Sequence, residues 1–229
     1  MKPKKTFYTE IAYVIAMLLL ALGAALMEKA DFGLSMVVAP AYILHLKISQ
    51  FLPWFTFGVA EYTLQAVLLI LMVVILRTFK IPYLFSFVTA VLYGTVLDGC
   101  ILVAALLPLG GFVGRIVYFV VGVLLGSIGV SLFFKSYISP EVYELLVKEV
   151  AGKFHFNIHK VKTVYDCASC FLAIVLSFSF FGLWHFEGVS VGTILCALCN
   201  GYLISRVSAF LEAHFTFRDK FPLRKKFEL

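Results

Sequence analysis

Val189-Ser-Val-Gly-Thr-Ile-Leu-Cys-Ala-Leu-Cys-Asn-Gly-Tyr-Leu-Ile-Ser-Arg206 is the stretch that decides how the whole chain is interpreted. It is apolar enough to cross a bilayer, yet it contains two cysteines, one asparagine and two glycines. An earlier stretch, residues 90–98, is its weaker copy. The positions that correspond are Ala90 with Ala197, Gly94 with Gly201, and Asp98 with Ser205.

A second pair of stretches indicates the same duplication. Residues 23–29 read Gly-Ala-Ala-Leu-Met-Glu-Lys and residues 129–135 read Gly-Val-Ser-Leu-Phe-Phe-Lys, so that Gly, Leu and Lys recur at the same spacing. The offset between these two stretches is almost that of the first pair. We therefore expect two related halves, residues 1–109 and residues 110–229.

The bulk composition indicates a membrane protein. Hydrophobic residues make up 62% of the chain and charged residues only 14%, whereas roughly a quarter of the residues in a soluble domain are charged. The formal net charge is +6, but the basic residues gather at helix ends and in loops, as membrane topology requires. The expected partner is therefore a lipid bilayer, and nucleic acid is not expected.

Six stretches approach the roughly 20 apolar residues that cross a hydrocarbon core about 30 Å thick. They cover residues 7–27, 57–76, 83–107, 116–134, 161–182 and 189–211. The apolar run of the first, residues 11–26, is long for the core of a signal peptide, so we expect a retained helix. The expected fold class is an all-α polytopic membrane protein with six transmembrane helices.

Each half also contains a short segment that does not cross. Residues 36–46 reach about 16 Å as a helix, roughly half of the hydrocarbon core. This segment is either a re-entrant half-helix or a helix in the interface. The second short helix starts at Ser139 and Pro140, which are strong helix-start signals. Its separate polar and apolar faces favour the interface over the bilayer centre.

The basic residues predict the orientation. With six crossings and both termini in the cytoplasm, all 19 Lys and Arg residues except Lys29, Lys47 and Arg115 fall on the inner side. The positive-inside rule therefore places the chain in the plasma membrane with cytoplasmic termini. Because each half has an odd number of crossings, the two three-helix repeats must insert in opposite orientations.

Inverted repeats recur in transporters and channels, whose substrate sites lie near the bilayer midplane between the repeats. We expect a transporter or permease for a small solute or ion. The alternative is a membrane-embedded scaffold or assembly factor with a protein partner. An enzyme is not expected, because the chain has no phosphate loop, no HExxH and no Ser nucleophile motif. Whether the protein forms a homo-oligomer stays open.

Polar side chains within the crossings are the candidates to line such a site. Ionisable groups in a bilayer cost about 2.5 to 3.5 kcal/mol on insertion scales, so they usually face a bundle interior or a watery cavity. Asp98 and Asp166 fall at depths that would let them share one central site from opposite halves. The alternative is a structural network in which Asp166 bonds Tyr165 or Asn200. The expected substrate-binding or ion-binding residues are Asp98, Asp166, Gln65, Asn200 and Glu61.

The cysteines form two CxxC pairs, residues 167–170 and residues 196–199, on consecutive crossings. Four thiolates would suit Zn²⁺ or another soft metal. In hydrophobic helices, however, cysteine is a small apolar residue that packs closely. We therefore expect packing, with no metal and no cofactor. Gly122 and Gly126 form a GxxxG motif, which we expect to pack helices within the chain.

The chain resembles the YczE/YitT-like family of bacterial membrane proteins. The residues that carry the resemblance are 188–193, Ala197, Asn200, Gly201, residues 162–166 and residues 30–35. The pattern departs from the family at residues 35–38, where Gly-Pro and an acid are usual. The resemblance covers most of the chain and implies a multi-pass protein of the bacterial inner membrane.

Overall fold

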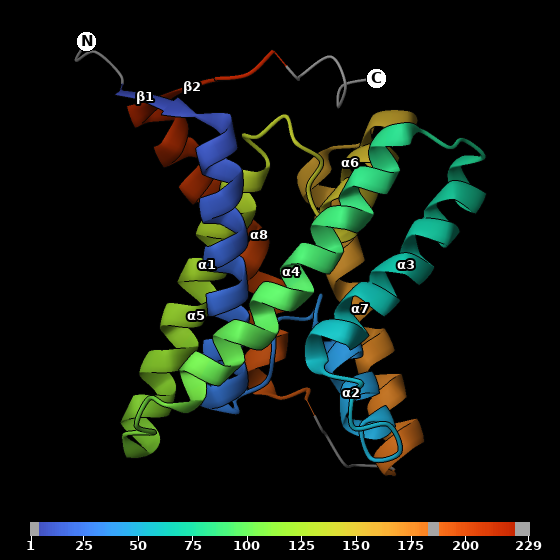
Figure 1. Cartoon of the computed structure of the whole chain (residues 1–229), viewed down its shortest axis with the longest axis vertical. Coiled ribbons are helices and arrows are strands. Elements are labelled where there is room, and N and C mark those ends of the chain that lie inside the picture. The colour runs from blue at the N-terminus through green and yellow to red at the C-terminus, as the bar shows by residue number, and fades with distance from the viewer. Residues whose placement is uncertain (1–4, 183–187, 223–229) are drawn as a thin grey trace.

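The computed structural model describes residues 5–182 and 188–222, and in these ranges the chain forms eight helices and two short strands (Figure 1). The helices are α1 (Thr9–Ala30), α2 (Ala39–Ile48), α3 (Phe57–Leu76), α4 (Ile81–Ala105), α5 (Gly111–Phe133), α6 (Val142–Phe154), α7 (Ile158–Phe181) and α8 (Val191–His214). The strands are β1 (Lys5–Tyr8) and β2 (Phe215–Arg218).

Six helices are long and apolar enough to cross a membrane: α1, α3, α4, α5, α7 and α8. They confirm the predicted crossings and the all-α polytopic membrane fold. The bounds of α3 are those predicted, whereas α5 begins at Gly111 and not at residue 116. Arg115 does not stop this helix, because its guanidinium donates to the carbonyl of Ala30 and to the carboxylate of Asp31.

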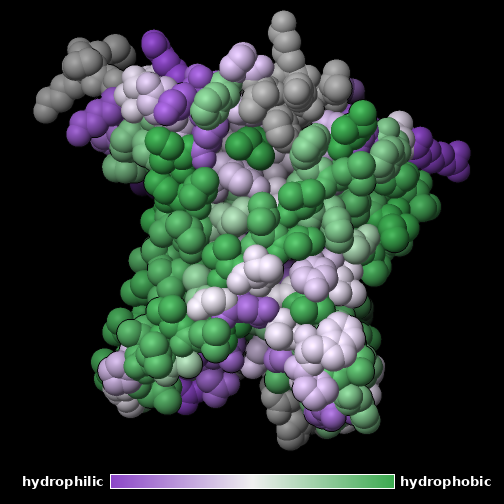
Figure 2. All heavy atoms as spheres, viewed as in Figure 1, coloured by the Kyte–Doolittle hydropathy of each residue, from purple (hydrophilic) through white to green (hydrophobic). Residues whose placement is uncertain are grey.

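The sides of the molecule are apolar. On the face shown in Figure 2, a broad hydrophobic region lies below the hydrophilic residues that gather at the end with the strands. The exposed side chains that build the apolar surface include Ile70, Val74, Leu102 and Val113. A soluble monomer rarely exposes so large an apolar area, so lipid chains are the natural contact of this surface.

The first and last described segments meet at one end of the molecule. β1 and β2 pair in parallel, with Lys5 opposite Phe215 and Tyr8 opposite Arg218. The Glu10 carboxylate accepts hydrogen bonds from the backbone N–H groups of Lys220 and Phe221. We call this end the strand end, and the opposite end, where α2 lies, the α2 end (Figure 1). The sequence did not predict these strands.

Small residues allow α1 and α5 to cross closely. A Cβ atom added to Gly23 would lie 2.7 Å from the carbonyl oxygen of Gly122, and one added to Gly122 would lie 2.7 Å from that of Gly23. Neither position has room for a side chain. The GxxxG glycine Gly122 therefore packs helices within the chain, as predicted.

The two short helices use the same two long helices. Both α2 and α6 pack against α3 and α7, while α1 packs against α5 and α4, and α5 packs against α8. Two related halves would produce this pattern of packing. The inverted orientation of the halves, and the boundary between residues 109 and 110, stay predictions.

The helix α6 runs beside the second half of α3. Its first N–H, that of Val142, donates to Gln65 in the middle of α3, and Lys153 near its end donates to the carbonyl of Leu76, where α3 ends. Both contacts join residues 77 apart in the sequence, so α6 and α3 run in the same direction over this length. α6 is therefore re-entrant, which corrects the interface placement that its amphipathic pattern favoured. At its start the polar side chains Glu141 and Glu144 are buried, whereas Lys148 and Lys153 further along are exposed.

Candidate functional site

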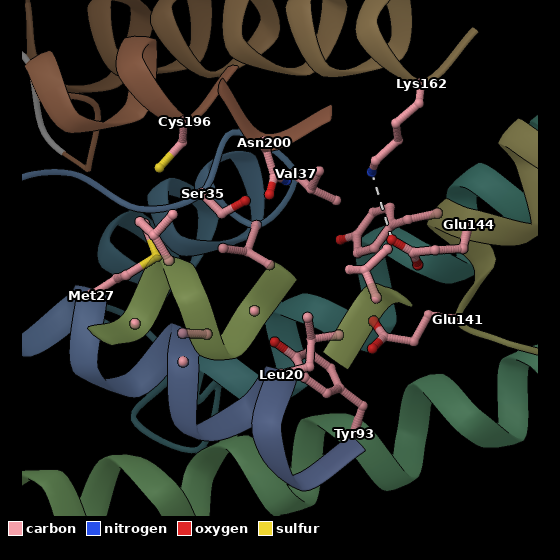
Figure 3. A pocket seen from close by; sticks show the side chains of 18 residues that line it. Leu20, Met27, Ser35, Val37, Tyr93, Glu141, Glu144, Lys162, Cys196 and Asn200 are labelled. Carbon is pink, nitrogen blue, oxygen red and sulfur yellow. Dashed lines mark ion pairs between the residues drawn. The ribbon is translucent and has the colours of Figure 1, made fainter. Parts of the chain in front are cut away.

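A cavity of about 60 Å³ lies between α1, α5 and α8 on one side and the starts of α2 and α6 on the other. We call it the central cavity. Figure 3 shows Glu141, Glu144 and Lys162 together at one end of it and Met27 and Cys196 at the other. The cavity therefore has a charged end and a mainly apolar end.

The charged end belongs to a buried polar cluster between α3, α6 and α7. Its ionisable members are Glu61, Glu141, Glu144, Lys162 and Asp166, each no more than 4% exposed. Glu141 and Glu144 reach this depth because α6 starts in the middle of the molecule, next to Gln65 of α3.

Gln65 links the start of α6 to α3. Its Oε1 accepts the N–H of Val142 at 3.0 Å, and its Nε2 donates to Oε2 of Glu141 at 2.9 Å. The first N–H groups of a helix have no partner within the helix. A single buried amide thus satisfies one of these donors and one carboxylate oxygen, which fixes the position of Glu141.

Glu61 and Tyr143 form the second link between these helices. The Tyr143 hydroxyl donates to Oε2 of Glu61 at 2.8 Å, and both side chains are almost fully buried. The other oxygen of Glu61 has no hydrogen-bond partner.

Lys162 is the cation of the cluster. Its Nζ lies 3.1 Å from Oδ1 of Asp166, one turn further along α7, and 3.6 Å from Oε1 of Glu144. All three side chains are buried. Breaking a buried pair of this kind is costly, since it leaves a charge without a partner in a region of low dielectric constant.

Negative charge exceeds positive charge in the cluster. Four carboxyl groups face one ammonium group, and five of their buried oxygens have no hydrogen-bond donor: Oε1 of Glu61, Oε1 of Glu141, Oε2 of Glu144 and both oxygens of Asp166, of which Oδ1 has only the ion pair with Lys162. Burial raises the pKa of the Glu141 carboxyl well above its usual range, and the carboxylates of Glu144 and Glu61 raise it further. Burial also raises the pKa of Glu144, although Lys162 opposes this. Such a cluster can take up protons or a cation.

The structure brings together three of the five residues predicted for a central site, and a fourth lies in the wall of the adjoining cavity. Glu61, Gln65 and Asp166 belong to the polar cluster, and Asn200 lines the central cavity, where its Oδ1 accepts from the Ser127 hydroxyl at 3.2 Å. The proposed network of Asp166 with Tyr165 or Asn200 is replaced by the ion pair with Lys162.

Asp98 lies elsewhere. Its carboxylate accepts a hydrogen bond from the Thr56 hydroxyl at 2.6 Å and from the N–H of Gly58 at 2.9 Å, so it caps the start of α3. The expectation that Asp98 and Asp166 share one site is therefore wrong. The sequence predicts how deep Asp98 lies along its helix, but not which neighbour its side chain meets. That neighbour is the start of α3, because Gly58 and Gly94 let α3 and α4 approach closely.

Sequence reasoning missed Glu141, Tyr143, Glu144 and Lys162 as members of the site. Lys162 and Asp166 are four residues apart on one helix, which is the spacing of a helical ion pair. A lysine and an aspartate at this spacing within an apolar helix could have predicted the ion pair between Lys162 and Asp166. No comparable signal distinguished the acids of α6 from solvent-facing ones.

The cysteines do not gather. Cys170 and Cys196 are buried, whereas Cys167 and Cys199 are exposed. In the described part of the chain, no group of three or more His, Cys, Asp or Glu side chains has an arrangement that could hold a metal ion. Cys196 instead contributes to the wall of the central cavity.

Two further cavities adjoin the central one. We call the cavity of about 80 Å³ toward the α2 end the outer cavity, and the one toward the strand end the inner cavity, after the orientation that the sequence predicts; the outer cavity is lined by Met27, Glu28, Asp31 and residues before α8. The inner cavity, of about 270 Å³, is lined by Lys162, Ile204, Ser208 and neighbours. Met27 is shared by the outer and central cavities, and Lys162 by the central and inner cavities.

The two segments on either side of the outer cavity are bonded to each other. The N–H of Leu34 donates to the carbonyl of Gly188, and the N–H of Gly192 donates to that of Phe32. Gly33 has a φ of +94° and lies against Ser190 and Thr193, so a side chain there would be strained and would collide.

The chain belongs to a family of unknown function (DUF6198), whose model matches residues 7–209. The match includes five of the six candidate membrane-spanning helices in full, α8 up to residue 209, and the residues of the polar cluster. No curated protein and no solved structure gives a significant match to the chain.

Proposed function

We propose that this member of the family is a transporter that moves a small solute or ion across the membrane through the central cavity. The observation that carries the proposal is the series of three cavities, which meet at Met27 and at Lys162. In this arrangement the two side chains close the central cavity toward the outer and the inner side. A solute held there is separated from both aqueous phases, as alternating access requires.

One face of α8 supports this route. Cys196 and Asn200 line the central cavity, and Ile204 and Ser208 line the inner one. These residues are four apart in the sequence, so they form a stripe along the helix. A solute that leaves the central cavity toward the strand end would follow this stripe past Lys162.

The proposal includes the inverted repeat and its orientation. The short helices α2 and α6 would be corresponding half-helices of the two repeats, and both begin beside the central cavity. Broken or half-helices near the midplane are where transporters bind their substrates. The positive-inside rule places the strand end in the cytoplasm and the protein in the plasma membrane, as the YczE/YitT-like resemblance also implies.

The buried carboxyl groups would supply the coupling. Protons or a cation on Glu141 and Glu144 change the charge next to Lys162, and so change the strength of the contact that closes the inner side. In this role the protein is a transporter and not an enzyme.

The native thiol of Cys196 allows a direct test. In a variant that keeps Cys196 and has alanine at the other four cysteines, a membrane-impermeant methanethiosulfonate reagent is added to either side of proteoliposomes. We expect modification from each side, because a transport cycle opens the cavity alternately. A variant that keeps only Cys170, which is buried but lines none of the three cavities, is the matched control and should not react.

Reaction of Cys196 from neither side, or from one side alone, would contradict the proposal. In that case the alternative of a membrane-embedded scaffold or assembly factor would be favoured. A protein subunit that purifies with the chain would then be the next observation to seek.

A further inference from the structure

We propose that the central cavity binds a small organic cation, a protonated amine or guanidine with a short alkyl group, whose N–H groups bond Glu141 and Glu144. This inference rests on the proposed function and names the chemical class of the solute. It comes from the charge, the hydrogen-bonding groups and the size of the cavity.

The first argument is charge. Glu141 and Glu144 are the acids in the cavity wall, and Lys162 is its only basic side chain among the described residues. Lys162 is already shared between Glu144 and Asp166. The wall therefore has negative charge that no protein group neutralises, which favours a cation over an anion or a zwitterion.

The second argument is hydrogen bonding. Oε1 of Glu141 and Oε2 of Glu144 have no donor, although their residues are only 1% and 3% exposed. Buried carboxylate oxygens normally accept hydrogen bonds, and both of these residues line the central cavity. A ligand with two or more N–H donors would satisfy both oxygens, whereas a quaternary ammonium ion would satisfy neither.

The third argument is the rest of the wall. Away from the charged end, the cavity is lined mainly by carbon, from residues such as Leu20, Ala24, Met27 and Val123, and by Gly126, which has open space where a side chain would be. A bare metal ion needs several oxygen ligands, and this wall does not surround it with them. An alkyl group matches it well, because apolar surface is removed from water when it binds.

The fourth argument is size. A volume of about 60 Å³ corresponds to roughly two waters of the liquid. Ethylammonium or a similarly short alkyl cation is of this order. Glu28 of the outer cavity would attract the same charge from the α2 end, whereas Asp31 is already paired with Arg115.

Protons compete with this ligand for the same oxygens. The titratable groups near Glu141 and Glu144 are Tyr13 from α1, Glu61 from α3, Tyr93 from α4, Tyr143 from α6 itself, and Lys162, Tyr165 and Asp166 from α7. The nearby acids disfavour a second negative charge, so a proton binds readily when the cation leaves. Glu141 and Glu144 alone would therefore allow the cavity to exchange the organic cation for protons.

The test is calorimetric titration of the purified protein with ethylammonium chloride in sodium-free buffer. We expect binding by the wild type and a loss of affinity of about tenfold or more in Glu144→Gln, since hydrogen bonds to charged groups are the strong ones. Glu149→Gln is the matched control on the same helix. It should keep its affinity because Glu149 pairs with Lys80 and Tyr83 outside the cavity.

Three comparison ligands make the result specific. Propionate has a similar size and the opposite charge, tetramethylammonium has no N–H donor, and sodium chloride supplies an inorganic cation; each should bind more weakly than ethylammonium. Lower pH should weaken the binding of ethylammonium by the wild type, because protons occupy the same oxygens. This measurement does not depend on whether a substituted protein folds. Equal affinity in Glu144→Gln, or stronger binding of any of the three comparison ligands, would overturn the inference.

The two proposals fail in different ways. If Cys196 is modified from both sides but ethylammonium does not bind, the protein is a transporter of another class of solute. If ethylammonium binds but Cys196 is closed to one side, the site exists and the transport proposal is wrong.

Discussion

Nζ of Lys162 lies 3.6 Å from Oε1 of Glu144, and this pair joins a membrane-crossing helix to the buried start of a re-entrant one. Lys162 also lies in the wall of both the central and the inner cavity. The contact therefore holds α6 against α7, and in the proposed transport cycle it would also close the inner side. The strength of this contact depends on whether Glu144 is charged. A ligand or proton on Glu144 in the central cavity would therefore change how firmly α6 is held against α7.

Replacing Lys162 by alanine should strongly destabilise the protein. The change leaves Glu144 and Asp166 buried without their cation, and loss of one partner from a buried ion pair costs about 3–5 kcal/mol. The measurement is the free energy of unfolding in detergent micelles. Lys160→Ala, at an exposed position on the same helix, should have little effect. Equal stability of the two variants would show that the ion pair is not formed.

Replacing Asp98 by alanine should affect stability and not transport. Asp98 caps α3 by accepting from Thr56 and Gly58, and loss of a helix cap costs about 0.5–2 kcal/mol. Asp98→Asn keeps an acceptor oxygen and should lose less. Both variants should keep the wild-type Cys196 modification pattern per folded molecule, and a change in that pattern would return Asp98 to the functional site.

The crossing of α3 and α4 gives a prediction with an internal control. A Cβ atom at Gly58 would overlap the carbonyl oxygen of Gly94, whereas one at Gly99 on α4 would meet nothing within 4 Å. Gly58→Ala should therefore destabilise the protein by about 1–3 kcal/mol through overpacking. Gly99→Ala should be neutral or slightly stabilising, since alanine is the better helix former. Thermal unfolding of the two variants decides, and the reverse order would contradict the packing.

The orientation can be tested with two single cysteines in a background without native ones. Phe112 belongs to the first turn of α5, which starts at the α2 end, and Phe156 to the connection from α6 to α7 at the strand end (Figure 1); both side chains are exposed. In intact cells, an impermeant thiol reagent should label Phe112→Cys and should reach Phe156→Cys only after the membrane is opened. The opposite pattern would invert the proposed topology.

The sequence predicts the crossings well and their faces poorly. The bounds of α3 follow from hydropathy alone, because a membrane helix needs only length and apolar composition. The burial of Glu141 and Glu144 does not follow, because an amphipathic pattern shows that α6 has a polar face but not what that face meets. Lys162, in the neighbouring helix α7, supplies the missing partner, and only the tertiary packing places it there. The short pairing of β1 with β2 depends in the same way on where the two ends of the chain meet.

Flux of methylguanidinium into proteoliposomes tests the central claim most directly. This cation stays charged at every useful pH, as guanidinium groups do, so leakage of a neutral form does not obscure the result. With an acidic interior and an alkaline exterior, we predict uptake by the wild type that stops when the pH gradient is removed and is lost in Glu144→Gln but not in Glu149→Gln. Uptake no faster than in protein-free liposomes, or uptake that is the same in Glu144→Gln, would contradict the account.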